Sequence, residues 1–298
     1  MTANALKRFA KMWCPPAIAH TARTTLDKIG ITSSHRLVGP YASWQEAERV
    51  STTYAAPVIL DRVAASTAKL LRGEAVYERD SVTFDEIEWP WSLLAALGRQ
   101  AAIDGGTLRV LDVGGSLGGT FVIARRFLDH RIQMSWRVVE QSHFVARAAQ
   151  LAMPPGISFF SSVTSATESF IPNVVLASGV LQVLSHPHDA LKELLSIGAN
   201  TLIIDRTPCI DSPEDVLTVQ QVPAKIFPAS YPNWLFSRQR LLGEVKMHYR
   251  EVASFDLGEQ LMFKSHLIVH TGWVFERNQA LDKDGRSHTP ANDASHPM

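Results

Sequence analysis

The sequence has little cysteine, no net charge and no long apolar run. Its two cysteines, Cys14 and Cys209, belong to no Cys-x-x-Cys or Cys/His pattern, which excludes a disulfide framework and favours a reducing compartment. No apolar run approaches the roughly 20 residues that span a bilayer, and the chain start lacks the apolar core of a signal peptide. We therefore expect a soluble, cytoplasmic protein.

The charges balance, with 29 basic and 29 acidic side chains among 298 residues. Because there is no global field of either sign, we expect no nucleic-acid partner. The first 30 residues mix basic and apolar side chains at helical spacing: Lys7, Arg8 and Lys11 with Leu6, Phe9, Met12 and Trp13. Such a segment predicts either a weak contact with a membrane surface or packing onto the body of its own protein.

The most informative stretch is 110–119, which reads VLDVGGSLGG. An apolar run meets four glycines in this stretch, and FVIARRFL then resumes with helical spacing. This is the strand, tight turn and helix of a nucleotide-binding βαβ unit, in which a ligand approaches bare backbone at the positive end of the helix dipole. The alternative is a plain strand-to-helix turn in another α/β protein.

The spacing of the glycines separates two classes of ligand. A dinucleotide site needs G-x-G-x-x-G, but no frame fits, since Ser116 occupies the third position counted from Gly114. S-adenosylmethionine (SAM) methyltransferases of class I carry an acid, one spacer and then glycines at alternate positions. Asp112, Gly114, Ser116 and Gly118 follow that pattern, with serine in the middle slot.

A second acid supports the SAM interpretation. The apolar stretch WRVVE ends at Glu140, about 20 positions beyond Gly118, where the second strand of such a unit places the acid that binds both ribose hydroxyls. With Asp112 and Glu140 both in place, the sequence favours a SAM site over a plain turn.

Strand-like and helix-like segments alternate from this unit onward, which predicts a parallel sheet with ligands at the carboxyl ends of its strands. HYREVASFD and LIVHTGWVFER are strand-like and predict a closing hairpin. We expect an α/β, Rossmann-like class I methyltransferase fold with a mostly parallel seven-stranded sheet, an antiparallel C-terminal edge hairpin and N-terminal accessory helices. One of these helices begins after Ser43, with Glu46 three residues later, and another ends at Gly73.

We divide the chain into three parts. Residues 1–75 hold the accessory helices, 76–278 form the methyltransferase domain, and 279–298 have too few apolar residues to build a core and should be disordered. Within the domain, 207–245 is an aromatic insertion punctuated by prolines, which predicts a wall or lid of an acceptor site. Its alternative is burial against the body or against a second copy of the chain, as in a homodimer.

Several stretches together carry a family resemblance: YASW (41–44), YERDSVTFD (77–85), VLDVGGSLGGTF (110–121), WRVVEQ (136–141), SGVLQVL (178–184), IIDRTP (203–208) and TVQQVPAKIFPASYPNW (218–234). In this order they resemble a family of class I SAM-dependent methyltransferases encoded in bacterial surface-polysaccharide gene clusters, over about residues 40 to 277. The resemblance implies SAM as the cofactor and O-methylation of a sugar or glycan hydroxyl. It also implies a sugar, nucleotide-sugar or lipid-linked glycan as the acceptor.

The resemblance to methyltransferases adds residues to the cofactor set. Ser161 or Ser162 lies where such enzymes contact adenine, and Gln182 lies where they contact the methionine part of SAM. Arg79 precedes the core at a place suited to the SAM carboxylate. A solvated turn is the alternative for Arg79. The full set predicted to bind the cofactor is Arg79, Asp112, Gly114, Gly115, Ser116, Gly118, Glu140, Gln141, Ser161, Ser178, Gly179 and Gln182.

Methyl transfer to a hydroxyl needs one general base. The candidates at strand ends or in the insertion are His186, His188, Asp205 and Tyr231. Both histidines have a competing interpretation as capping or surface residues, because Pro187 and DALKELL read as a helix start, and Asp205 has one as a structural partner of Arg206. No third ligand accompanies the two histidines, so we expect no metal.

Two rival functions remain open at this point. A non-catalytic member of the same fold could bind SAM or a nucleotide sugar within a biosynthetic assembly, since Ser116 replaces the middle glycine and no base is unmistakable. An NAD(P)-dependent sugar oxidoreductase is disfavoured by the glycine spacing and by the absence of a Tyr-x-x-x-Lys pair.

Overall fold

The computed structural model describes residues 35–52, 57–79, 82–222 and 229–278, so the N-terminal segment and the C-terminal tail discussed above lie outside the described residues. The helices are α3 (Trp44–Arg49), α4 (Pro57–Leu71), α5 (Trp91–Ile103), α6 (Gly119–Phe127), α7 (Ser142–Ala148), α8 (Val163–Thr167), α9 (Pro187–Ile197) and α10 (Arg238–Lys246), with a 3-10 turn η1 (Leu181–Val183). The strands are β1 (His35–Val38), β2 (Tyr77–Arg79), β3 (Val82–Phe84), β4 (Thr107–Val113), β5 (Gln133–Val139), β6 (Ile157–Phe160), β7 (Val174–Ser178), β8 (Thr201–Ile210), β9 (Val216–Val222), β10 (Ala229–Ser237), β11 (Tyr249–Phe263) and β12 (His266–Arg277).

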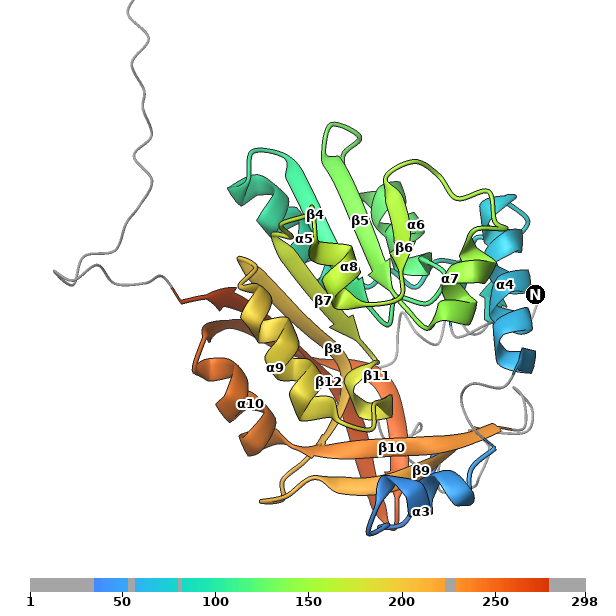
Figure 1. Ribbon diagram of the computed structural model, residues 1–298, viewed down its shortest axis with the longest axis vertical. Helices are drawn as coiled ribbons and strands as arrows, with labels where there is room; N and C mark the ends of the chain where they lie inside the picture. The colour runs from blue at the N-terminus through green and yellow to red at the C-terminus, as the bar shows by residue number, and fades with distance from the viewer. Residues whose placement is uncertain (1–34, 53–56, 80–81, 223–228, 279–298) are drawn as a thin grey trace, which may run out of the picture.

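Five parallel strands form one half of the main sheet, in the order β6, β5, β4, β7 and β8, with β6 at the edge. Helices cover both faces, because these strands are apolar on both sides. Leucines of α5 and Phe121 of α6 pack on one face, whereas α8, α9 and α10 pack on the other (Figure 1). The doubly wound α/β architecture expected from the sequence is present.

The C-terminal hairpin is present but does not lie at the edge of the sheet. Strand β12 pairs antiparallel with β8, and β11 pairs antiparallel with β12. Beyond β11 the sheet continues through β1, β9 and β10, so it has ten strands among the described residues and not the expected seven. The edge of β11 that β12 leaves free pairs in parallel with β1. This strand lies within residues 1–75, for which the sequence predicted only accessory helices.

The insertion is built into the sheet as β9 and β10. Strand β10 pairs antiparallel with β9 and also in parallel with the end of β8, where Phe236 lies opposite Cys209. The pairings among β8, β12, β11, β1, β9 and β10 therefore close on themselves, and we call these six described strands the closed strand ring. One buried cluster drawn from four of them marks its inner face: Leu37, Leu235, Leu261 and Ile268.

Helix α3 covers the outer face of the ring where β9 and β10 cross the lower end of the view (Figure 1). Ala47 of α3 is fully buried against Leu217 and Val219 of β9. The predicted N-cap is confirmed, since the Ser43 hydroxyl accepts a hydrogen bond of 3.2 Å from the Glu46 N–H. This accessory helix thus stabilises the strands of the insertion.

None of the helices in the described ranges combines the length and the apolar character that a membrane-spanning helix needs.

Candidate active site

The glycine loop follows β4 and leads into α6. Gly118 caps the helix with a φ of 78°, and Ser116 also adopts the left-handed conformation, with a φ of 52°. A Cβ on Gly115 would lie 2.5 Å from the carboxyl carbon of Asp112, so no larger residue fits there without displacing that side chain. The loop therefore presents bare backbone at the carboxyl end of β4, as the sequence predicted.

The Asp112 side chain packs against Gly115 of this loop. It is 1% exposed, and its Oδ2 accepts a hydrogen bond of 2.9 Å from the Trp136 indole N–H. Burial raises the pKa of Asp112 to about 7, although the bond from Trp136 acts in the opposite direction. The visible role of Asp112 is to pack under Gly115, and direct contact with a cofactor remains a prediction.

Glu140 faces the glycine loop from the neighbouring strand. Strand β5 pairs with β4 in parallel, so both strands end at the same edge of the sheet. One oxygen of Glu140 accepts a hydrogen bond of 3.2 Å from the Ser116 N–H, and the other accepts one of 2.8 Å from the Gln141 N–H. Burial raises the pKa of this carboxyl. The second acid and the middle position of the glycine pattern are therefore in direct contact.

The topology brings other predicted cofactor residues to the same edge. Ser161 follows β6 and is exposed, and Ser178 ends β7, with Gly179 in the left-handed conformation beside it. Arg79 ends β2, in a hairpin with β3, and its side chain lies outside the described set. That hairpin lies against the start of α6, because a Cβ on Gly119 would be 3.1 Å from a carboxylate oxygen of Glu78.

Gln182 carries an unsatisfied oxygen at this edge. Its side chain is buried in η1, and its Nε2 donates a hydrogen bond of 3.1 Å to the carbonyl oxygen of Arg206. Its Oε1 is buried without a hydrogen-bond partner among the described residues. A buried amide oxygen left unpaired costs about 1–3 kcal/mol, so this position suits a ligand that donates a hydrogen bond.

Asp205 ends the first half of β8. It is 4% exposed, and its Oδ1 accepts a hydrogen bond of 2.8 Å from the Arg206 N–H, while its carbonyl oxygen accepts one from Gly179. Burial raises the pKa of Asp205 to about 6. The structure thus links Asp205 both to Arg206 and to Gly179, at the edge of the sheet that carries the glycine loop.

Sequence reasoning missed a charged cluster next to Asp205. The Nε of Arg206 donates to both oxygens of Glu259, at 3.1 Å each, and the Nδ1 of His270 lies 3.9 Å from Oε2 of the same carboxylate. The one signal in the sequence was His270, a polar residue inside the apolar run LIVHTGWVF. The sequence could not show which residues lie next to it, because that depends on how β8, β11 and β12 pair.

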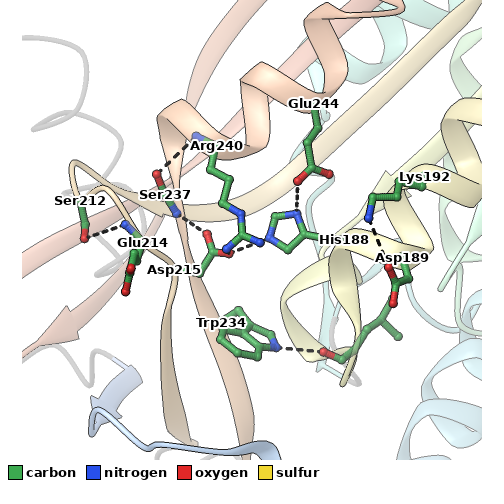
Figure 2. Close-up of polar contacts among 11 residues, drawn as sticks. His188, Asp189, Lys192, Ser212, Glu214, Asp215, Trp234, Ser237, Arg240 and Glu244 are labelled. Carbon is green, nitrogen blue, oxygen red and sulfur yellow. Dashed lines mark hydrogen bonds and ion pairs between the residues drawn. The ribbon is translucent and has the colours of Figure 1, made fainter.

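His188, at the start of α9, lies in a separate cluster (Figure 2). Its Nε2 lies 2.6 Å from Oδ2 of Asp215, and its Nδ1 lies 2.8 Å from Oε1 of Glu244 in a charge contact outside hydrogen-bond geometry. Burial acts to raise the pKa of Asp215, but the bonds from His188 and the Ser237 N–H outweigh it and lower that pKa. A pocket of about 260 Å³ beside this cluster contains no residue of the glycine loop.

This cluster ties α9 to the insertion. Asp215 precedes β9, and its oxygens also accept hydrogen bonds from the Ser237 N–H at the start of α10 and from Arg240. The helix start predicted at Pro187 is confirmed. His186 is exposed, and its Nδ1 lies 2.9 Å from the Ser185 hydroxyl. Catalytic roles for these two histidines stay predictions.

Tyr231 lies on β10 opposite Gln220 of β9, within the sheet and not on a detached lid. Side chains directly opposite each other in an antiparallel pair share a face, and Gln220 is in turn opposite Leu37 of the inner cluster. Tyr231 therefore faces the inside of the closed strand ring.

No family model and no curated protein matches this sequence. Among solved structures, it resembles the 1,6-didemethyltoxoflavin-N1-methyltransferase of Burkholderia thailandensis, crystallised with S-adenosylhomocysteine (SAH), at 15% identity and a TM-score of 0.42, covering 84% of this chain and 98% of that one. It also resembles the N-terminal domain of EvdMO1, crystallised in the presence of SAH and D-fucose, at 13% identity and a TM-score of 0.42, covering 68% of this chain and 90% of that one. The 4+2 cyclase SpnF is similar at 12% identity and a TM-score of 0.46, covering 81% and 98%. Because every one of these TM-scores is below 0.5, our fold assignment rests on the strand order described above.

The His188 cluster predicts a large effect on stability. Replacing His188→Ala removes the ring that lies between the carboxylates of Asp215 and Glu244 and its hydrogen bond to Asp215, which should lower the free energy of unfolding by about 2 kcal/mol. Because the pKa of Asp215 is lowered on folding, the part of the stabilisation that depends on its ionised form should be present above pH ~4 and lost as the pH falls further. Urea titration at several pH values measures both effects.

Lys192→Ala is the matched control, because Lys192 and Asp189 form an exposed pair on the same helix. This substitution should lower the free energy of unfolding by less than about 1 kcal/mol. Equal losses in the two variants would contradict an anchoring role for His188.

Proposed function

We propose that the protein is a SAM-dependent methyltransferase that O-methylates a sugar or glycan hydroxyl. The observation that carries the proposal is the Glu140 carboxylate, held against the glycine loop by the Ser116 and Gln141 N–H groups. A carboxylate has about four lone-pair sites, so two remain to accept hydrogen bonds from vicinal ribose hydroxyls.

The residues at this edge fit SAM on further grounds. The unpartnered Oε1 of Gln182 suits the ammonium of the methionine part, and the bare backbone of Gly114 to Ser116 suits close approach of the same part. Ser161 lies on the side expected for adenine, and Asp112 keeps the loop in place. When bound, SAM supplies an already activated methyl group.

The chain must then place the acceptor hydroxyl and remove its proton. Asp205 is our candidate base: the hydroxyl proton passes to its carboxylate as the oxygen takes the methyl group. A pKa of about 6 leaves this carboxylate mostly ionised at neutral pH while keeping its basicity close to the working pH.

The polysaccharide context rests on the motifs that resemble the surface-polysaccharide family. Accordingly, the proposed acceptor is a sugar, a nucleotide-sugar or a lipid-linked glycan, handled in the cytoplasm.

The cofactor assignment predicts a binding defect for one substitution. Glu140→Gln keeps the shape of the side chain but loses the charge that orients both hydroxyls, so the affinity for SAH should fall about tenfold or more. Isothermal titration calorimetry with SAH measures this loss, and NAD and NADP should give no heat.

Glu168→Gln, at an exposed position after α8, is the control and should bind SAH as the wild type does. Binding of NAD in place of SAH, or unchanged SAH affinity in Glu140→Gln, would rule out the proposed site.

The assignment of the base predicts a pH dependence. Methyl transfer should rise with pH through an apparent pKa near 6 and then level off, because Asp205 must be ionised to accept a proton. Asp205→Asn should remove most of this activity while binding SAH normally. Transfer of a labelled methyl group to a panel of glycan acceptors measures both.

Stability provides an independent check on the same carboxyl. Since the pKa of Asp205 is raised on folding, the native state binds more protons than the unfolded state between pH ~4 and pH ~6. The free energy of unfolding should therefore fall as the pH rises from ~4 to ~6. Asp205→Asn should flatten this fall. If the variant retains full activity and the wild-type pH profile, Asp205 is not the base.

A further inference from the structure

Two strand irregularities face each other at the cofactor end of the closed strand ring. The register of β11 against β12 shifts between Asp256 and Gln260, and the register of β12 against β8 shifts between Thr271 and Trp273. Such bulges redirect side chains and are frequent next to active sites. Here they coincide with the positions of Glu259 and Arg206, which form the ion pair described above.

The backbone of Arg206 is held in an uncommon conformation. Its φ is 53°, which costs a non-glycine residue about 1–3 kcal/mol. Three hydrogen bonds fix it: the Asp205 carboxylate accepts from its N–H, Gln182 donates to its carbonyl oxygen, and the Gly179 N–H donates to the preceding carbonyl. Residues of the cofactor edge therefore determine where the Arg206 side chain points.

The Arg206 side chain connects the cofactor edge to the inside of the ring. A Cβ on Gly179 would lie 3.8 Å from an Nη atom of Arg206, whereas the Nε of the same guanidinium is bonded to Glu259. Glu259 lies two residues before Leu261 of the inner cluster, and His270 lies two residues after Ile268 of that cluster. By strand alternation from Ile268, His270 lies on the inner face. Glu259 lies within the bulge, and its carboxylate is 3.9 Å from Nδ1 of His270, which places it beside that face.

This part of the inner face is polar and reached by solvent. The side chains of Arg206 and Glu259 are 28% and 26% exposed, although both belong to an ion pair inside the ring. Gln220 and Tyr231, paired across β9 and β10, face the same interior. Parts of this ion pair therefore remain in contact with solvent.

We propose that Arg206, Glu259 and His270 form the subsite that binds the acceptor, and that this acceptor is a neutral polyhydroxylated molecule, that is, a saccharide. The proposal rests on the function proposed above and names its substrate-binding surface. Glu259 pairs with Arg206, so this ion pair itself carries no net positive charge that would attract an anionic ligand. Hydroxyl groups both donate and accept, so they match a surface that offers a carboxylate, a guanidinium, an imidazole and an amide.

The test is saturation-transfer-difference NMR on the full chain with SAH present. The probes are the methyl glycosides of common hexoses, deoxyhexoses and N-acetylhexosamines. At least one should bind to the wild type, and Glu259→Gln should weaken its binding about tenfold or more, because a hydrogen bond to a charged acceptor is lost. His270→Gln, which keeps a polar side chain on the inner face, should also weaken the binding of the same glycoside.

Glu251→Gln is the matched control: Glu251 lies on the same strand, is ion-paired to Lys246 and is distant from the bulge. It should bind the glycoside as the wild type does, and all variants should keep the wild-type affinity for SAH, which shows that the fold is intact. Wild-type glycoside binding in both Glu259→Gln and His270→Gln, or no binding of any probe to the wild type, overturns the subsite.

The two proposals fail in distinguishable ways. If SAH gives no calorimetric signal but a glycoside binds and loses affinity in Glu259→Gln, the subsite is supported and the methyltransferase assignment is wrong. If SAH binds but no glycoside does, the cofactor assignment is supported and the subsite is wrong.

Discussion

Strand β8 is the element on which the rest of the structure depends. Its first half pairs with β7 and β12 and belongs to the doubly wound sheet, whereas its last residues pair with β10 and close the strand ring. The left-handed conformation of Arg206 lies between these two halves. One strand thus fixes the edge that carries the glycine loop and a polar inner surface relative to each other, through backbone hydrogen bonds.

The surrounding contacts serve the same arrangement. Helix α3 packs on the outside of β9 and β10, and the buried contacts among His188, Asp215 and Glu244 tie α9 to the start of β9 and to α10. The insertion is therefore held at both its helical and its strand ends. If the proposed site is correct, these contacts hold the strands of the acceptor subsite next to the cofactor.

The parts of the site that could be predicted from the sequence are those set by local spacing. The glycine loop and Glu140 belong to one βαβ unit, so their contact follows from the register of two adjacent parallel strands. The helix starts after Ser43 and at Pro187 follow from capping chemistry. The ring could not be predicted, because β1 has only four residues and no turn signal links it to β9 or β11. Arg206 and Glu259 are 53 residues apart and meet only through two bulges, which no periodicity reveals.

Hydrogen–deuterium exchange with and without SAH tests the central claim most directly, because it locates the cofactor without any knowledge of the acceptor. The account predicts added protection on peptides that contain the glycine loop at 114–118, the end of β5 at 140–141 and the turn at 179–182, since these segments converge at one edge of the sheet. Protection confined to other segments, or none at all, would contradict the assignment of this edge as a SAM site.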